Sequence, residues 1–132
     1  MKLPIEVFTR WAEEGRDEAM AKGHAKSVNA MLNFTFKNID DPFTFIDSGC
    51  GNGWVVRMVG DHPLCSKAIG IDGSTSMIEK AISIDNKNTY ECEEIINWIP
   101  DEKVDLIFSM EVFYYVNNPI KLIDHVVKNW LQ

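Results

Sequence analysis

The chain contains few cysteines and histidines, and both are widely spaced. Its 132 residues include three of each, and no two cysteines form a C-x-x-C pair. The six residues are Cys50, Cys65 and Cys92, and His24, His62 and His125. This spacing excludes a disulfide framework and any recognisable zinc-ligand pattern, so we expect no metal. Dispersed thiols without a secretion signal are typical of a cytoplasmic protein.

Long hydrophobic runs and basic clusters are also missing. Apolar stretches such as LIF at 106–108 are too short to cross a bilayer, which argues against a membrane protein. Acidic residues outnumber basic ones 20 to 13, and the formal net charge is -7. Because phosphate contacts need clustered Lys and Arg, nucleic acid is disfavoured as a partner. The length and the 45% hydrophobic content fit one globular domain.

What the sequence does contain is an alternation of short apolar runs and helical patterns. Asp40, Asp41 and Pro42 form a break that separates an N-terminal helical part from this alternation. Helices are predicted at 5–14, 17–22, 27–38, 53–61, 74–83 and 119–131, and strands at 43–47, 67–72, 88–92 and 104–110. Gly23 is predicted to stop the second helix, Ser74 to cap the fifth, and Asn118 with Pro119 to open the last.

This order predicts an α/β fold with a parallel sheet and helices on both faces. The run 104–110 is apolar nearly throughout, which is typical of a strand covered on both faces. Ligands of such sheets bind outside the carboxyl ends of the strands. The stretch FIDSGCGNGW, residues 45–54, lies at the end of the first predicted strand and is therefore the expected binding loop.

The glycines of this loop favour one ligand class over another. Their pattern is G-x-G-x-G, and Trp54 stands where the dinucleotide pattern G-x-G-x-x-G needs its third glycine. Asp47 would repel a pyrophosphate, but it suits the ammonium of an amino-acid-like tail. S-adenosylmethionine has such a tail. Asp72, at the end of the second strand, is placed to accept from ribose hydroxyls, a role that fits either ligand class.

Three motifs together carry a family resemblance. FIDSGCGNG, AIGIDGSTSMIEKA and VDLIFSMEVFYYVNNP occur in this order at ordinary spacing. Over residues 43–131 the chain resembles the Rossmann-like class I S-adenosylmethionine-dependent methyltransferases. The resemblance implies a sheet of order 3-2-1-4 in one domain over 1–132. Residues 1–42 would form a helical N-terminal cap, and 43–132 a partial Rossmann-like core.

The resemblance also implies the residues that bind the cofactor. The first motif would line the methionine moiety, the second the ribose and adenine, and the fourth-strand loop the methyl group. Either Cys92 or Glu93 takes the place of the acid that accepts from the adenine amino group, with Glu94 as a further option. The implied set is Asp47, Gly49, Cys50, Gly51, Asp72, Gly73, Met77, Cys92, Glu93 and Ser109.

The catalytic residues stay open. Direct in-line methyl transfer needs mainly positioning and desolvation, so a dedicated acid or base is optional. The candidates are His24, Glu111, Tyr114 and Tyr115. The two tyrosines stand where relatives often carry two histidines that face the substrate. The acidic charge favours a small-molecule acceptor.

The chain departs from the family at its end. The family sheet has seven strands, whereas this sequence stops at Leu131 and Gln132, where a turn into the fifth strand would begin. The fourth strand is then an apolar edge, which needs a partner or a cover. We therefore also consider a truncated, inactive relative that acts as an S-adenosylmethionine-binding module or as a homodimer through that edge. An NAD-dependent oxidoreductase is the remaining, minor alternative.

Overall fold

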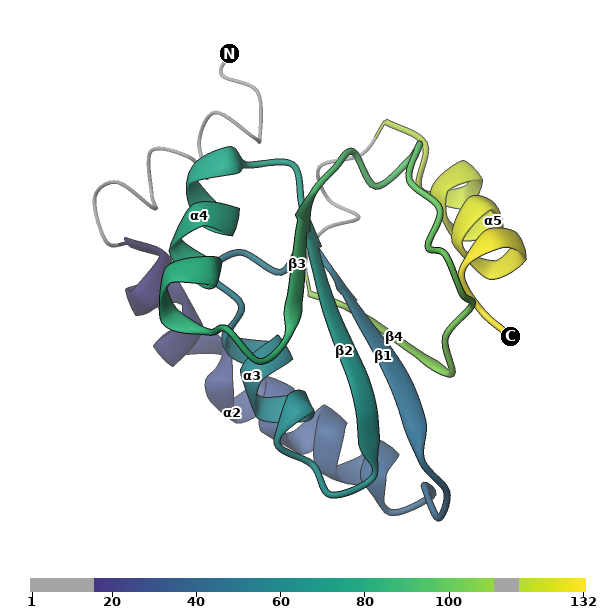
Figure 1. Cartoon of the computed structure of the whole chain (residues 1–132), viewed down its shortest axis with the longest axis horizontal. Coiled ribbons are helices and arrows are strands. Elements are labelled where there is room, and N and C mark those ends of the chain that lie inside the picture. Colours follow the sequence, from purple (N-terminus) through teal and green to yellow (C-terminus); the bar gives the residue numbers. More distant parts are fainter. Residues whose placement is uncertain (1–15, 111–116) are drawn as a thin grey trace.

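The computed structural model describes residues 16–110 and 117–132, and within them one parallel sheet organises the molecule (Figure 1). Its four strands follow the order β3-β2-β1-β4, as predicted. The strands are β1 (Phe43–Ser48), β2 (Cys65–Asp72), β3 (Thr89–Cys92) and β4 (Leu106–Ser109). All three strand pairs are parallel, so the carboxyl ends of the strands lie at one edge of the sheet.

Helices cover both faces of the sheet, as expected from right-handed crossovers (Figure 1). One face carries α2 (Arg16–Phe36), α3 (Trp54–Gly60) and α4 (Thr75–Ile84), and the other carries α5 (Pro119–Asn129). Each face has its own core cluster. Val28 and Leu32 of α2 pack in the first with Phe43 and Phe45, while Trp130 packs in the second. The proposed division at residue 42 stays a prediction.

The two predicted N-caps are confirmed. The Ser74 hydroxyl accepts a hydrogen bond from the Met77 N–H at the start of α4. The Asn118 side chain accepts from the Lys121 N–H, and Pro119 occupies the first turn of α5. Each cap satisfies an N–H that the helix itself leaves unpaired. The capping residues in the sequence therefore set the starts of α4 and α5.

The predicted break at Gly23 is wrong. A single helix, α2, runs through this glycine from residue 16 to residue 36 and replaces the predicted helices at 17–22 and 27–38. A glycine inside a helix costs only about 1 kcal/mol, which packing of the helix against the sheet can offset. Val28 and Leu32 supply such packing. The predicted helix at 5–14 lies outside the described residues.

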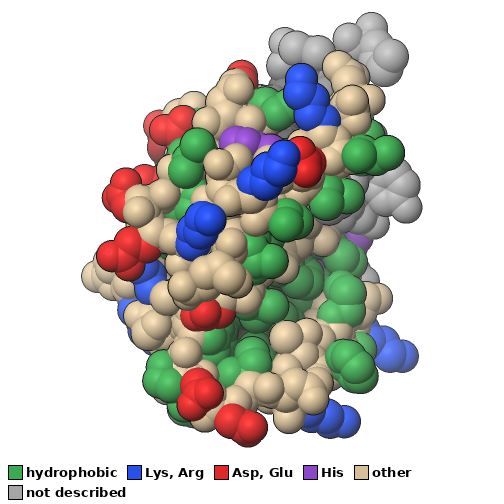
Figure 2. All heavy atoms as spheres, turned by 90° about the vertical axis from the view of Figure 1, so that its right-hand side faces the viewer, with side chains coloured by type: hydrophobic (Ala, Val, Ile, Leu, Met, Phe, Trp, Pro, Cys, Tyr) green, Lys and Arg blue, Asp and Glu red, His purple; other side chains and the backbone are tan. Residues whose placement is uncertain are grey.

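The expectation that the 104–110 strand is covered on both faces is met only in part. Leu106 and Phe108 pack against the first core cluster and Ile107 against the second, but β4 is shorter than predicted and its residues are only half-buried. Among the described residues, β1 is the one strand that pairs with β4. The nearby helix α5 buries Leu122, yet Ile120, Ile123 and Val127 are exposed. Figure 2, which views this side of the molecule, shows hydrophobic side chains spread across it. None of the described helices is long and apolar enough to span a membrane.

Candidate functional site

The glycine loop follows β1 at the carboxyl edge of the sheet, where the sequence places it. Its three glycines, Gly49, Gly51 and Gly53, have φ values of 80°, 55° and 85°, a region that L side chains rarely adopt. The Gly49 and Cys50 N–H groups both donate to the Ile71 carbonyl of β2, at 2.7 and 2.9 Å. The loop is thus folded back over the end of the neighbouring strand before α3 begins.

Asp72 ties this loop to the start of α4. One carboxylate oxygen accepts from the Gly51 N–H and the other from the Ser74 N–H, each at 2.9 Å. Burial raises the pKa of the Asp72 carboxyl, although these two hydrogen bonds act in the opposite direction. Each oxygen keeps a second lone pair, so the carboxylate can still accept from a ligand. Nothing in the sequence signals the bond to Gly51.

Asp47 stands in a different electrostatic position. Its side chain is 3% exposed at the end of β1, and among the described residues no donor binds its carboxyl group. Burial raises its pKa to about 8, and the nearby Asp72 carboxylate contributes to the rise. A buried acid without a donor is unfavourable for folding alone. The site therefore holds an acceptor that a cationic group could satisfy.

Cys50 and Met77 pack beneath the loop. Both side chains are buried, and the Met77 sulfur lies 3.9 Å from where a β-carbon on Gly51 would stand. The Cys50 sulfur lies against Gly70 of β2, 2.8 Å from the equivalent position there. Burial raises the pKa of the Cys50 thiol well above its ordinary value, so a nucleophilic thiolate is disfavoured. The structure thus shows Cys50 as a buried side chain that packs against Gly70.

The predicted residues on the outer strands reach the same edge. Asp72 pairs with Cys92 in the register of β2 and β3, and the Glu93 N–H donates to the Asp72 carbonyl at 3.1 Å. Cys92 and Glu93 are both exposed, while Gly73, which follows Asp72, is half-buried. On the other side, Ser109 pairs with Ser48 of β1. The buried Ser109 hydroxyl has no hydrogen-bond partner within the described part of the chain.

Of the four catalytic candidates, His24 alone lies within the described residues. Glu111, Tyr114 and Tyr115 lie outside them. His24 is half-buried and sits within helix α2, whereas the sequence suggested a loop after Gly23. Between residues 16 and 110 and from 117 onward, no group of three or more His, Cys, Asp and Glu side chains could hold a metal ion.

Sequence reasoning missed one residue that shapes the loop. Tyr90 of β3 lies under Gly53, with ring atoms 2.6 to 2.9 Å from where a β-carbon on that glycine would stand. Its hydroxyl donates to Asp85, beyond the end of α4. Gly53 is therefore required both by its positive φ and by the close aromatic ring. A tyrosine in a short strand gives no sequence signal of this contact.

Comparisons with known proteins agree with this geometry. Residues 14–129 match the family model described as a methyltransferase domain. Trans-aconitate 2-methyltransferase from Rhizobium rhizogenes is 28% identical over 82 residues, covering 62% of this chain and 32% of that protein. A complex of the Haloferax volcanii Trm112 methyltransferase activator with a methyltransferase superposes with a TM-score of 0.79 at 27% identity, covering 95% of this chain and 55% of that one.

A further solved structure, the DhpI–SAH complex, has a TM-score of 0.74 at 18% identity and covers 96% of this chain and 61% of that one. At that identity the likeness shows the fold alone. The chain spans about one third of the length of the curated relative and just over half of the solved methyltransferase in the Trm112 complex. The family match spans most of the chain, from before the sheet to the last helix. This chain belongs to the methyltransferase-domain family.

Proposed function

We propose that the protein binds S-adenosylmethionine and transfers its methyl group to a small-molecule acceptor. One observation carries the proposal. In a chain of the methyltransferase-domain family, a loop of three positive-φ glycines and two buried aspartates meet at the carboxyl edge of a parallel sheet. That edge is where open α/β sheets bind their ligands.

The donors and acceptors present fit this cofactor better than a dinucleotide. Asp47 is a buried acceptor with no donor among the described residues, which suits the ammonium of the methionine tail. The Ser109 hydroxyl, also without a partner in the described part of the chain, is available to the same tail. A pyrophosphate would instead face two aspartates, Asp47 and Asp72, which disfavours the NAD-dependent alternative.

The residues proposed to hold the cofactor fall into three groups. Asp47, Gly49, Cys50, Gly51 and Ser109 would line the methionine tail. Asp72, Gly73 and Met77 would line the ribose and one side of the adenine. Cys92 and Glu93 would lie near the adenine amino group. These assignments rest on the positions that the residues occupy around one edge of the sheet.

Bound S-adenosylmethionine supplies a methyl group already activated by the sulfonium. The protein then has to position the reactants and exclude water, which is a large part of catalysis for two-substrate reactions. The buried side chains of Met77 and Cys50 give the loop an apolar surface on its inner side. His24, Glu111, Tyr114 and Tyr115 are the proposed candidates for any proton transfer from the acceptor.

The acceptor is proposed from relatives and from charge. The name of the Rhizobium rhizogenes relative gives trans-aconitate, a small molecule, as its substrate. The net charge of -7 disfavours RNA or DNA as an acceptor. The three cysteines are all free thiols, which supports a reducing compartment such as the cytoplasm.

Isothermal titration tests the cofactor directly. S-adenosylmethionine and NAD are titrated separately into the wild type, Asp72→Asn and the exposed control Asp101→Asn. We expect micromolar binding of S-adenosylmethionine alone, weakened at least about tenfold in Asp72→Asn and unchanged in the control. Thermal melts show that each variant is folded. Binding of NAD, or absence of S-adenosylmethionine binding by folded wild type, contradicts the proposal.

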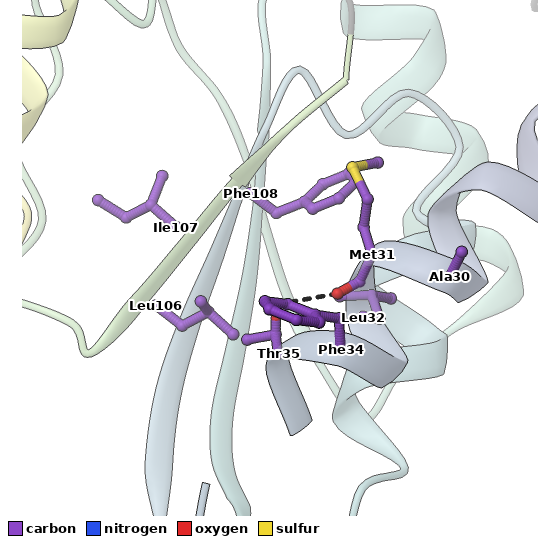
Figure 3. Close-up of a pocket in the computed structure, with 8 residues that line it drawn as sticks. All are labelled: Ala30, Met31, Leu32, Phe34, Thr35, Leu106, Ile107 and Phe108. Atoms are coloured by element: carbon purple, nitrogen blue, oxygen red, sulfur yellow. Dashed lines mark hydrogen bonds between the residues drawn. The ribbon is translucent and has the colours of Figure 1, made fainter. Parts of the chain in front are cut away.

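A second candidate is a cofactor-binding module that pairs with another copy through β4. The observation that favours it is the free edge of this strand, beside an apolar pocket of about 470 Å³. Figure 3 shows Met31 of α2 and Phe108 of β4 directed toward one another across this pocket. Phe34, at its rim, is 72% exposed.

Sedimentation equilibrium tests this candidate. A homodimer of this kind is expected to dissociate in Phe34→Glu, because a charge would have to be buried in an apolar contact. The control Lys37→Glu changes an exposed residue one turn further along the chain and should leave the dimer intact. A monomeric wild type across the micromolar range removes this candidate.

A further inference from the structure

The two aspartates at the carboxyl edge form an asymmetric pair. They come from adjacent strands, β1 and β2, and their side chains are only 3% and 9% exposed. Asp72 receives two backbone N–H groups, whereas no described donor reaches Asp47. Two carboxylates that share a buried region cannot both ionise without a large electrostatic cost. The two hydrogen bonds favour the charged form of Asp72, and Asp47 has no such support among the described residues.

We infer that Asp47 holds a proton in the ligand-free protein, and that the ammonium of the bound cofactor displaces this proton into solvent. The inference rests on the proposed function and adds a proton linkage to it. The exchange balances: one carboxylic O–H loses its proton to buffer, and one protonated amino group becomes the counter-ion of the carboxylate. Cofactor binding therefore becomes weaker as the pH falls.

The surroundings of Asp47 support this reading. Burial raises its pKa to about 8, with Asp72 as the charged neighbour that contributes. The Cys50 thiol beside the pair is neutral, because its own pKa is raised by burial. Arg57 of α3 lowers the pKa of the Cys50 thiol but is not among the causes of the Asp47 shift. The paired residues of β4, Phe108 and Ser109, carry no charge.

The test is titration calorimetry of S-adenosylmethionine at about pH 6.5, where the ligand amino group is protonated. Buffers of matched ionic strength but different ionisation enthalpy are compared. The slope of observed enthalpy against buffer ionisation enthalpy gives the protons released. We expect about one proton per bound ligand and a dissociation constant that rises about tenfold for each pH unit lost below 7.

Asp47→Asn is the matched variant, since the amide resembles the protonated acid in size and cannot titrate. Its binding is expected to be weaker and to release no proton. Asp40→Asn, an exposed acid at the break before β1, should release as many protons as the wild type. Carboxyl-labelled aspartate NMR of the ligand-free wild type should show one acid that titrates near pH 8, absent from Asp47→Asn.

The outcomes separate the inference from the function on which it rests. Binding without proton release, or equal release by Asp47→Asn, overturns the inference and leaves the proposed function standing. An Asp47 resonance that titrates near pH 4 overturns it as well. If the wild type binds no S-adenosylmethionine while the NMR shows the raised titration, the proposed function fails and the protonated acid is a property of the fold alone.

Discussion

Asp47 at the carboxyl end of the parallel sheet and Asp105 at its amino end have opposite surroundings. At the carboxyl end, Asp47 is buried and receives no described donor. At the amino end, Asp105 is exposed and accepts from the Thr44 N–H, the Thr44 hydroxyl and the Gln132 side chain. Asp47 is thus buried without a described hydrogen-bond donor, whereas Asp105 accepts three hydrogen bonds that hold neighbouring segments together.

This difference separates the proposed binding end of the sheet from a stabilising end. The carboxyl end contains positive-φ glycines, a buried hydroxyl without a described partner and raised carboxyl pKa values. The amino end is closed by Trp130, which is fully buried, and by a short bridge between Val104 and Leu131. Unfavourable features gather where a ligand can relieve them, as is common at functional sites.

Trp130→Ala should give the largest effect on the stabilising end. Its indole N–H donates to the Trp98 carbonyl at 2.8 Å, and its own carbonyl accepts from Val104. We expect a loss of about 3–5 kcal/mol in the free energy of unfolding, measured by urea denaturation. The half-buried Trp98→Ala should lose less. Where Trp130→Ala is still folded, cofactor affinity should be unchanged, and a large drop would show that the two ends are not separate.

Substitutions of Asp47 and Asp105 should change the pH dependence of the free energy of unfolding in opposite directions. Folded Asp47 keeps a proton that the unfolded chain releases, so wild-type stability falls as the pH rises from about 4 to about 8. Asp47→Asn is therefore expected to exceed the wild type by on the order of 3 kcal/mol near pH 8, with the gain shrinking toward pH 5.

Asp105 is the matched control in this experiment. The hydrogen bond from the Thr44 N–H is the main reason that its pKa lies below the usual value. Its contribution is present above about pH 4 and is lost as the pH falls further. Asp105→Asn should thus be less stable than the wild type at neutral pH and approach it in acid. Parallel urea-denaturation profiles for the two variants would contradict the comparison.

Two glycine substitutions sharpen the comparison within the binding end. Gly53→Ala must keep a φ of 85° and place a β-carbon 2.6 Å from the Tyr90 ring, so we expect a loss of about 2 kcal/mol or more. Gly51→Ala meets only Met77 at 3.9 Å and should lose about 1 kcal/mol from backbone strain. Thermal unfolding measures both. Equal losses would mean that the Tyr90 contact contributes nothing.

Local sequence patterns predicted a parallel sheet and the edge at which a ligand is expected, and the family resemblance implied the strand order that the structure shows. Short apolar runs such as FTFID fix strands, and Ser74 and Asn118 fix helix starts. It failed at Gly23, where tertiary packing overrides a weak helix-breaking preference. It also overestimated the burial of β4, because an apolar run does not reveal how completely neighbouring elements will cover a strand.

For the site, the sequence supplied the residue types but not their states. The G-x-G-x-G spacing and the acids Asp47 and Asp72 can be identified from the sequence alone, and their ligand roles stay predictions. That Asp72 accepts from Gly51, or that Tyr90 lies under Gly53, depends on contacts between residues 21 and 37 positions apart. Such contacts exist only once the strands are side by side.

The sequence by itself therefore determined most of the strands and helices and the loop at the carboxyl edge of the sheet, because hydrophobic period, glycine spacing and capping act over a few residues. The pairing order of the strands came from the family resemblance. Only the tertiary structure decided which of Asp47 and Asp72 receives hydrogen bonds. Burial and hydrogen bonding set the charge of an acid, and both are properties of the assembled sheet: Asp72 gains two N–H groups from the folded loop, and Asp47 is left in the interior without a described donor.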